Sequence, residues 1–193
     1  MIRIVAGELG GRRLRTPAGL STRPTAERVR QALFNILGSI PTGGTVWDLC
    51  AGSGALGIEA LSRGAGQAVF VDSDPSACRV LRHNLGALGL VSRTQVVEAP
   101  LARFLAGKRP PQPVALILAD PPYASGELQR LLDWLARHGA ECLAPDGRVV
   151  LETDQRNAAL LTPGSRCGVL ECCDSRRYGD TVLLFLTKSP DAA

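Results

Sequence analysis

The chain has 193 residues, of which 45% are hydrophobic and 21% charged, a balance typical of a single globular domain. Its apolar runs, such as Val114 to Ala119, fall short of the roughly 18 residues that a membrane-spanning helix needs. The N-terminus also lacks the long apolar core of a secretory signal. Membrane and secreted classes are therefore excluded, and a cytoplasmic protein is expected.

The net charge of +4 is unevenly distributed. Residues 1–44 hold seven arginines and two glutamates, so this segment carries all of the net positive charge. Local basicity of this kind favours a polyanionic partner, although an arginine-rich solvated surface is the alternative.

In chain order, residues 1–24 are rich in Gly, Arg and Pro and predict short strands and loops without a core of their own. An amphipathic helix begins at Thr25 and ends at Gly38. Strands then alternate with helices, which predicts an α/β fold with a doubly wound, mostly parallel, seven-stranded sheet. We expect residues 1–24 to form a basic hairpin and loop extension and residues 25–193 to form the main domain.

The expected strands are 45–50, 67–71, 94–97, 114–119, 148–152, 168–173 and 182–187, and the expected helices after the first are 55–63, 75–88, 101–106 and 127–137. The last two strands bracket a short polar connection and are predicted to pair antiparallel. In a sheet of this kind, ligands bind at the carboxyl ends of the parallel strands.

Six cysteines and two histidines occur, without Cys-x-x-Cys or any other metal-ligand spacing. We expect buried, reduced thiols and no metal, because free cysteine in apolar stretches behaves as a small hydrophobe.

A glycine-rich loop follows the first predicted strand of the main sheet. Gly52, Gly54 and Gly57 fit G-x-G-x-x-G between a strand and a helix, where glycine lets the backbone turn sharply and approach a ligand. Asp72 follows Gly52 by 20 residues and can accept hydrogen bonds from ribose hydroxyls. An adenosine-type cofactor is predicted, and nicotinamide enzymes share this geometry. Asp48 favours S-adenosylmethionine, because a carboxylate there would hold an ammonium group and repel a pyrophosphate.

The fourth strand ends in Asp120-Pro121-Pro122-Tyr123. The two prolines make a stiff turn just past a buried strand. Asp120 and the Pro121 carbonyl can accept the hydrogens of an exocyclic amine, and Tyr123 can stack on the base. The amine lone pair is then free to attack, so no protein nucleophile is needed. The absence of a Pro-Cys dipeptide argues against cytosine C5 chemistry, which uses a thiolate.

These motifs resemble those of the class I, Rossmann-like methyltransferases that act on amino groups with S-adenosylmethionine. The resemblance covers nearly the whole chain and is specific for the bacterial RsmD-type family, which methylates the N2 amine of one guanine in 16S ribosomal RNA. The segments that carry it are 3–17, 22–30 and 177–181.

The resemblance implies a role for each matching residue. Cofactor binding is implied for Asp48, Ala51, Gly52, Ser53, Gly54, Asp72, Ser73, Glu98, Ala99, Arg23, Pro24 and Thr25. Of these, Asp72 would bind the ribose, Glu98 and Ala99 would border the adenine, and Arg23 would pair with the carboxylate. The catalytic site is implied at Asp120, Pro121, Pro122 and Tyr123.

The implied partner is 16S ribosomal RNA in the small subunit or an assembly intermediate. Arg12, Arg13 and Arg15 would contact phosphates, which position RNA without recognising its sequence. Tyr178, between the last two strands, would line the RNA side of the site. We expect a monomer.

Three other functions fit part of the pattern. An amino-methyltransferase acting on adenine N6 or cytosine N4, in RNA or DNA, would use the same Asp-Pro-Pro-Tyr turn. A nicotinamide oxidoreductase fits the glycine-rich loop, but the chain lacks a substrate domain and a plausible hydride-transfer acid/base pair. A non-catalytic RNA-binding protein that retains the cofactor fold is the third alternative.

Overall fold

The computed structural model describes residues 1–17, 24–40, 42–107, 110, 112–122 and 126–190. Its strands are β1 (Ile2–Arg3), β2 (Arg13–Leu14), β3 (Thr45–Leu49), β4 (Gln67–Asp72), β5 (Thr94–Glu98), β6 (Val114–Ala119), β7 (Leu143–Asp154), β8 (Arg166–Cys167), β9 (Leu170–Tyr178) and β10 (Thr181–Lys188). Its α-helices are α1 (Pro24–Leu37), α2 (Ala55–Ser62), α3 (Pro75–Leu88), α4 (Leu101–Leu105), α5 (Glu127–Cys142) and α6 (Gln155–Ala158).

The main sheet has the strand order β5-β4-β3-β6-β7-β10-β9-β8, and β1 and β2 form a separate antiparallel pair. The first five strands of that order are parallel, and β10, β9 and β8 are antiparallel. The predicted α/β fold is therefore confirmed, as is the antiparallel pairing of the last two predicted strands. The sheet has eight strands instead of seven, because the two residues of β8 are too short to give a strand pattern in the sequence.

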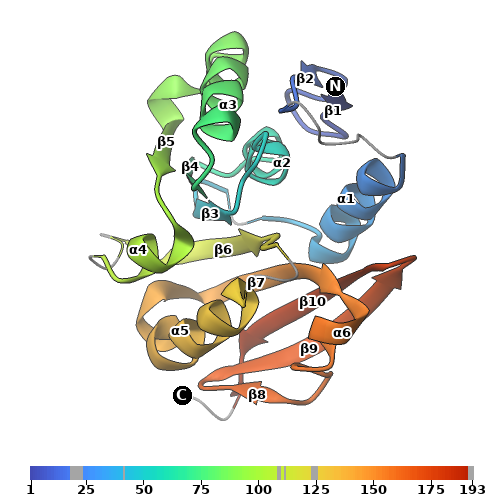
Figure 1. The fold of residues 1–193 in the computed structure, drawn as a ribbon, viewed down its shortest axis with the longest axis vertical. Helices are drawn as coiled ribbons and strands as arrows, with labels where there is room; N and C mark the ends of the chain where they lie inside the picture. Colours follow the sequence, from blue (N-terminus) through green and yellow to red (C-terminus); the bar gives the residue numbers. More distant parts are fainter. Residues whose placement is uncertain (18–23, 41, 108–109, 111, 123–125, 191–193) are drawn as a thin grey trace.

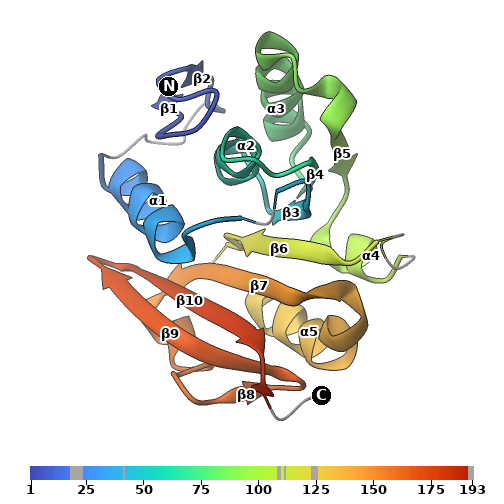
Figure 2. The same ribbon diagram turned by 180° about the vertical axis from the view of Figure 1, so that it is seen from behind.

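Helices cover both faces of the sheet. One apolar cluster joins α1, α2 and α3 to the sheet, and a second joins α4 and α5 to its other face. Figures 1 and 2 show the β1–β2 hairpin beside α1, on the same side as α2 and α3. Ile4 and Leu14 of this N-terminal segment are buried in the first cluster, beside α1 residues such as Phe34. The segment therefore shares the core of the main sheet.

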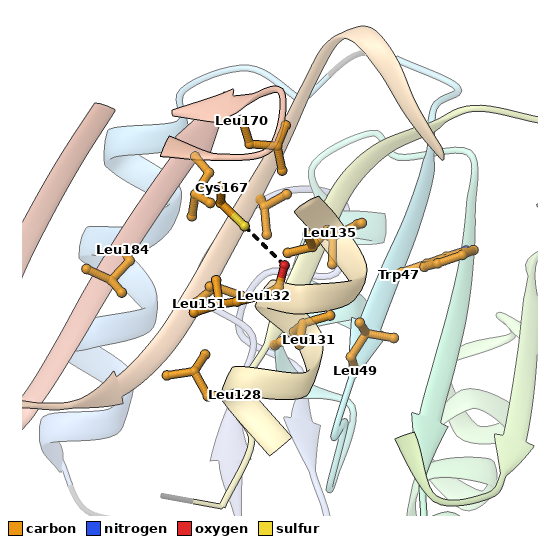
Figure 3. Close-up of a cluster of buried hydrophobic side chains, with 14 of the residues drawn as sticks. Trp47, Leu49, Leu128, Leu131, Leu132, Leu135, Leu151, Cys167, Leu170 and Leu184 are labelled. Carbon is orange, nitrogen blue, oxygen red and sulfur yellow. Dashed lines mark hydrogen bonds between the residues drawn. The ribbon is translucent and has the colours of Figure 1, made fainter. Parts of the chain in front are cut away.

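The second cluster explains why α5 is held firmly to the sheet. Leu128, Leu131 and Leu135 lie on one side of the helix and are buried over the strands (Figure 3). The Cys167 thiol donates to the Leu132 carbonyl at 3.1 Å and joins α5 to β8. Burial of each leucine contributes about 1.5–3 kcal/mol, so these contacts fix α5 on the sheet.

Several boundaries differ from the sequence prediction, chiefly those of α5, β7 and β9, and β9 continues to Tyr178 instead of ending at residue 173. The helix α5 continues through Gly139 to Cys142, because Gly139 packs against β9: a Cβ there would lie 3.2 Å from Leu170 Cδ1. The strand β7 begins at Leu143 instead of Arg148. Leu143 pairs with Val114 and Arg148 pairs with Leu116, so the Ala-Pro-Asp-Gly segment between them bulges out of the ladder.

All six cysteines are free, but Cys173 is exposed, contrary to the expectation of buried thiols. It lies on β9, where alternate side chains face opposite sides, and its neighbour Cys172 takes the buried position. No helix in the described ranges is long and apolar enough to cross a membrane.

Candidate active site

A cavity of about 450 Å³ opens where the parallel strands β3, β4, β6 and β7 end. Residues from the ends of these strands and from the loops and helices that follow them line it, together with Arg30 of α1, Ile2 of β1 and Thr16 just after β2. This is the edge of the sheet at which doubly wound folds bind ligands.

The glycine-rich loop forms one wall of the cavity. Gly52 and Gly54 have φ angles of 56° and 80°, which favour glycine, and between them the chain turns from β3 into α2. A Cβ on Gly52 would meet nothing within 4 Å, so a ligand can approach the backbone there. At Gly57 a Cβ would lie 2.4 Å from Phe70 Cε1, which shows that this glycine allows α2 to pack closely on β4.

Asp72 is the last residue of β4, and its carboxylate holds the glycine-rich loop in place. Its carboxylate accepts the Gly52 N–H at 2.7 Å through Oδ2 and the Asp74 N–H at 2.8 Å through Oδ1. Each carboxylate oxygen can accept a further hydrogen bond. Asp72 also lines the cavity, so it can accept hydrogen bonds from a ligand while it holds the loop.

Asp48 lies at the floor of the cavity and is 1% exposed. Its Oδ2 accepts the Gly57 N–H at 2.8 Å. Burial raises the pKa of this carboxyl to about 8, and the carboxylates of Asp120 and Asp72 add to the rise. A cationic ligand group beside Asp48 would favour its ionised form.

Asp120 follows β6 directly, and its N–H donates to the Leu49 carbonyl at 3.3 Å. This bond continues the β3–β6 pairing one residue past the strand and brings Asp120 to the cavity beside Pro122. The side chain opens onto the cavity, yet the surrounding protein desolvates the carboxyl and raises its pKa to about 6. Pro121 is buried under the turn, and Tyr123 lies outside the described residues.

The cavity lining includes four charged residues that sequence reasoning did not assign to the site: Arg30, Asp74, Glu127 and Glu152. Ala119 pairs with Leu151, so Asp120 and Glu152 occupy the next positions on neighbouring parallel strands. Burial, followed by the charge of Asp120, raises the pKa of Glu152 to about 8, and Arg30 opposes this rise. Only the register of β6 and β7 could have revealed Glu152, because no local motif surrounds it.

The other predicted cofactor residues fall into three groups. Ala51, Ser53, Ser73 and Ala99 line the cavity together with Asp48, Gly52 and Asp72. The side chain of Glu98 pairs instead with Arg82 at 3.0 Å, and Glu98 is absent from the cavity lining. Pro24 and Thr25 begin α1, but their side chains and the whole of Arg23 lie outside the described residues.

Two buried polar side chains hold the N-terminal segment against the cavity. Glu59 of α2 accepts the Val5 N–H at 2.7 Å and the Ala6 N–H at 3.0 Å. Asn84 of α3 accepts the Arg15 N–H at 2.9 Å and donates to the Ser53 carbonyl at 3.0 Å. The Asn84 side chain therefore connects the glycine-rich loop to the end of the N-terminal hairpin.

The predicted RNA-binding arginines are all exposed on this segment. Arg12 donates to the Ala87 carbonyl at 3.2 Å, whereas Arg13 lies opposite Arg3 in the β1–β2 pair. Tyr178 lies elsewhere, at the end of β9. Because Thr181 pairs with both Tyr178 and Asp154, the β9–β10 turn lies at the same edge of the sheet as the carboxyl end of β7.

A doubly wound sheet with a glycine-rich loop after β3, an acid at the end of β4 and an Asp-Pro-Pro turn after β6 defines a Rossmann-like methyltransferase fold. The family model described as "Conserved hypothetical protein 95" matches residues 2–187. The chain therefore belongs to this family, which is that of the RsmD-type methyltransferases.

Individual relatives agree with this assignment. The chain is 40% identical to YlbH of Bacillus subtilis over 156 residues, which covers 80% of this chain and 83% of YlbH. It is 35% identical over 164 residues to "Ribosomal RNA small subunit methyltransferase D" of Escherichia coli, covering 85% and 80% of the two chains. The solved structure of yhhF from Escherichia coli has a TM-score of 0.81 at 30% identity and covers 97% of this chain and 98% of its own.

The cofactor is S-adenosylmethionine, and the cavity fits it. The open space beside Gly52 admits a ligand to the backbone, Asp72 offers acceptors for ribose hydroxyls, and Asp48 offers a carboxylate for an ammonium. The chemistry of this donor set agrees with a ligand that carries a ribose and an amino acid but no phosphate. Among the described residues, no group of His, Cys, Asp and Glu is arranged to hold a metal ion.

Proposed function

We propose that this protein methylates the exocyclic N2 amine of a specific guanine in small-subunit ribosomal RNA. The observation that carries the proposal is that Asp120, at the start of the Asp-Pro-Pro turn, lines the same cavity as Gly52 and Asp72. The names of the relatives support ribosomal RNA of the small subunit as the substrate class. The choice of the guanine N2 amine rests on the resemblance to the family.

The residues of the chain have separate tasks in this reaction. Bound S-adenosylmethionine supplies the methyl group. The carboxylate of Asp120, with the carbonyl of Pro121, would accept the hydrogens of the amine and orient its lone pair toward the methyl carbon. As the N–C bond formed and the S–CH3 bond broke, S-adenosylhomocysteine would leave, and the amine would give up one proton to the Asp120 carboxylate, which would pass it to solvent. Tyr123 would stack on the base. The Cys50 thiol in the cavity has its pKa raised by burial and by the acids around it, so it is poorly suited to act as a nucleophile.

We assign RNA binding to the N-terminal segment, residues 1–24, and methyl transfer to residues 25–193. Arg3 and Arg13 face each other across the β1–β2 pair, where like charges repel, and a phosphate between them would relieve that repulsion. Ile2 and Thr16, beside these arginines, line the cavity, so RNA bound there would reach the site. Tyr178 would contact the RNA from the opposite side of α1. The protein would act as a monomer on the small subunit or an assembly intermediate.

The direct test uses labelled S-adenosylmethionine and small ribosomal subunits that lack the modification, with naked RNA and duplex DNA in parallel. The products are digested and their nucleosides identified. We expect label in N2-methylguanosine, strongest on the ribosomal particle. Label in methylated adenine or cytosine would keep the mechanism and refute the guanine assignment. Cofactor binding without label on any substrate would favour the non-catalytic RNA-binding alternative.

The RNA surface is tested by replacing Arg12, Arg13 and Arg15 together with Ala. We expect weaker RNA binding and a salt dependence of log affinity that is shallower by about 2–3 units, since each lost phosphate contact removes about one. Filter binding from low to high salt measures this slope. An unaltered slope would show that RNA docks elsewhere.

A further inference from the structure

Guanine differs from adenine and cytosine, the other two bases that carry exocyclic amines, at the ring nitrogen beside the amine. In guanine the N2 amine is followed along the Watson–Crick edge by the N1–H donor and then by the O6 acceptor. In adenine and cytosine, the ring nitrogen beside the amine carries a lone pair and no hydrogen. A hydrogen-bond acceptor placed next to the group that holds the amine would therefore select guanine, because base-modifying enzymes recognise a flipped base through this edge.

The cavity has such an acceptor. Asp120 and Glu152 follow a paired position on the parallel strands β6 and β7, and both line the cavity. Neighbouring strands lie about 4.8 Å apart. This separation is about twice the spacing of adjacent groups on a base edge, so carboxylates from the two strands can reach neighbouring donors of one base. Among the described residues, none donates a hydrogen bond to the Glu152 carboxyl, although Asp120 and Arg30 both act on it electrostatically.

Arg30 supplies a hydrogen-bond donor in the same cavity. It is only 5% exposed, lines the cavity, and donates a hydrogen bond to the Arg3 carbonyl at 2.5 Å. Its Nε has no hydrogen-bond partner and lies 3.9 Å from Glu59 Oε2. Electrostatic interactions join Glu152 to Asp120 and Glu152 to Arg30. Taken in the order of these interactions, the three charged groups are an acceptor, a second acceptor and a donor.

We propose that Glu152 is the specificity-determining residue of this site: its carboxylate accepts the N1–H of guanine while Asp120 accepts the N2 amine, and Arg30 donates to O6. Arg30 and the N1–H of a bound guanine both favour the ionised form of Glu152, and this carboxylate repels the lone pair that adenine N1 or cytosine N3 would present at that position. This assignment rests on the proposed function and names the residue that distinguishes guanine from the other two amino bases.

The test compares wild type with Glu152→Gln on unmodified small subunits and on subunits in which the target guanine is replaced by adenine. The amide puts an N–H donor where an acceptor is needed, so we expect kcat/KM on the guanine particle to fall about 100-fold or more. We expect the Kd for S-adenosylmethionine to change less than threefold, because Glu152 lies on the opposite half of the cavity from Asp72. We also expect the preference for guanine over adenine to decrease. Glu141→Gln, an exposed change near the end of α5, is the matched control and should leave all three quantities unchanged.

Retention of wild-type kcat/KM and guanine preference by Glu152→Gln would overturn the proposal. If that variant loses cofactor binding as well, the role of Glu152 is tested by inhibition of the wild-type enzyme. Guanosine should then inhibit methyl transfer at least tenfold more strongly than 1-methylguanosine, which lacks the N1–H. Equal inhibition would refute the role of Glu152. Failure of the proposed function is distinguishable, because the wild-type protein alone would then place label in a base other than guanine.

Discussion

The two halves of the cavity differ in how their carboxyl groups are satisfied. On the β3–β4 half, Asp48 and Asp72 accept backbone N–H groups at 2.7 to 2.8 Å. On the β6–β7 half, no described residue donates a hydrogen bond to the side chain of Asp120 or Glu152. The backbone therefore shapes the cofactor half in advance, whereas the other half keeps free acceptors for the donors of a substrate. This contrast predicts that substitutions in the two halves will separate turnover from cofactor affinity.

The largest effect is expected from Asp120→Ala. Removing the acceptor for the amine should lower kcat by about 1,000-fold, while the Kd for S-adenosylmethionine changes little, since the loop and Asp72 are untouched. Single-turnover methylation and calorimetry measure the two quantities. Asp146→Asn, an exposed change in the bulge at the start of β7, serves as control. Substantial remaining methyl transfer would refute the role of Asp120.

A smaller effect is expected from Asp72→Ala, which should lower cofactor affinity more than turnover. The cofactor affinity should fall about 100-fold, because hydrogen bonds to a charged group contribute about 1.5–3 kcal/mol and the Gly52 and Asp74 N–H groups also lose their acceptor. Turnover at saturating cofactor should be reduced much less. Calorimetry would contradict the ribose assignment if the affinity were unchanged. Asp133→Asn on the outer side of α5 is a suitable control.

The smallest effect concerns stability and pH. Burial raises the pKa of Asp48 and Glu152 to about 8, so the folded state binds more protons than the unfolded state between about pH 4 and 8. This stabilisation is present at low pH and is lost as the pH rises through 8. The thermal midpoint should therefore fall from pH 6 to pH 8, by about 2–4 °C for each kcal/mol of stability lost. Glu152→Gln should flatten this dependence, and calorimetric scans in which the wild-type midpoint rises with pH would contradict the argument.

Sequence reasoning succeeded where local residues determine local structure. The left-handed backbone of the loop favours glycine at positions 52 and 54, and the Asp-Pro-Pro turn follows an apolar strand. The loop and the turn could therefore both be located from the sequence alone. It did not identify Glu152 or Arg30, because these residues meet only through the β6–β7 register and the position of α1. Glu98 is expected beside the adenine by resemblance, and its ion pair with Arg82 of α3 was not predicted. Local sequence patterns therefore predicted the contacts within a motif, but not the contacts between residues distant in the sequence.

The hydrogen bonds of Glu59 and Asn84 have a consequence for synthesis of the protein. Residues 5, 6 and 15 leave the ribosome well before residues 59 and 84, which hold them. Until that later stretch emerges, the basic segment lacks these anchors and its arginines belong to an unfolded nascent chain. The proposed RNA-contacting face and the cofactor loop consequently gain their shared Asn84 anchor at the same moment, when α3 emerges. A nascent chain that has not yet exposed residue 84 lacks this anchor, so the proposed RNA-binding face and the cofactor site would mature at the same stage of synthesis.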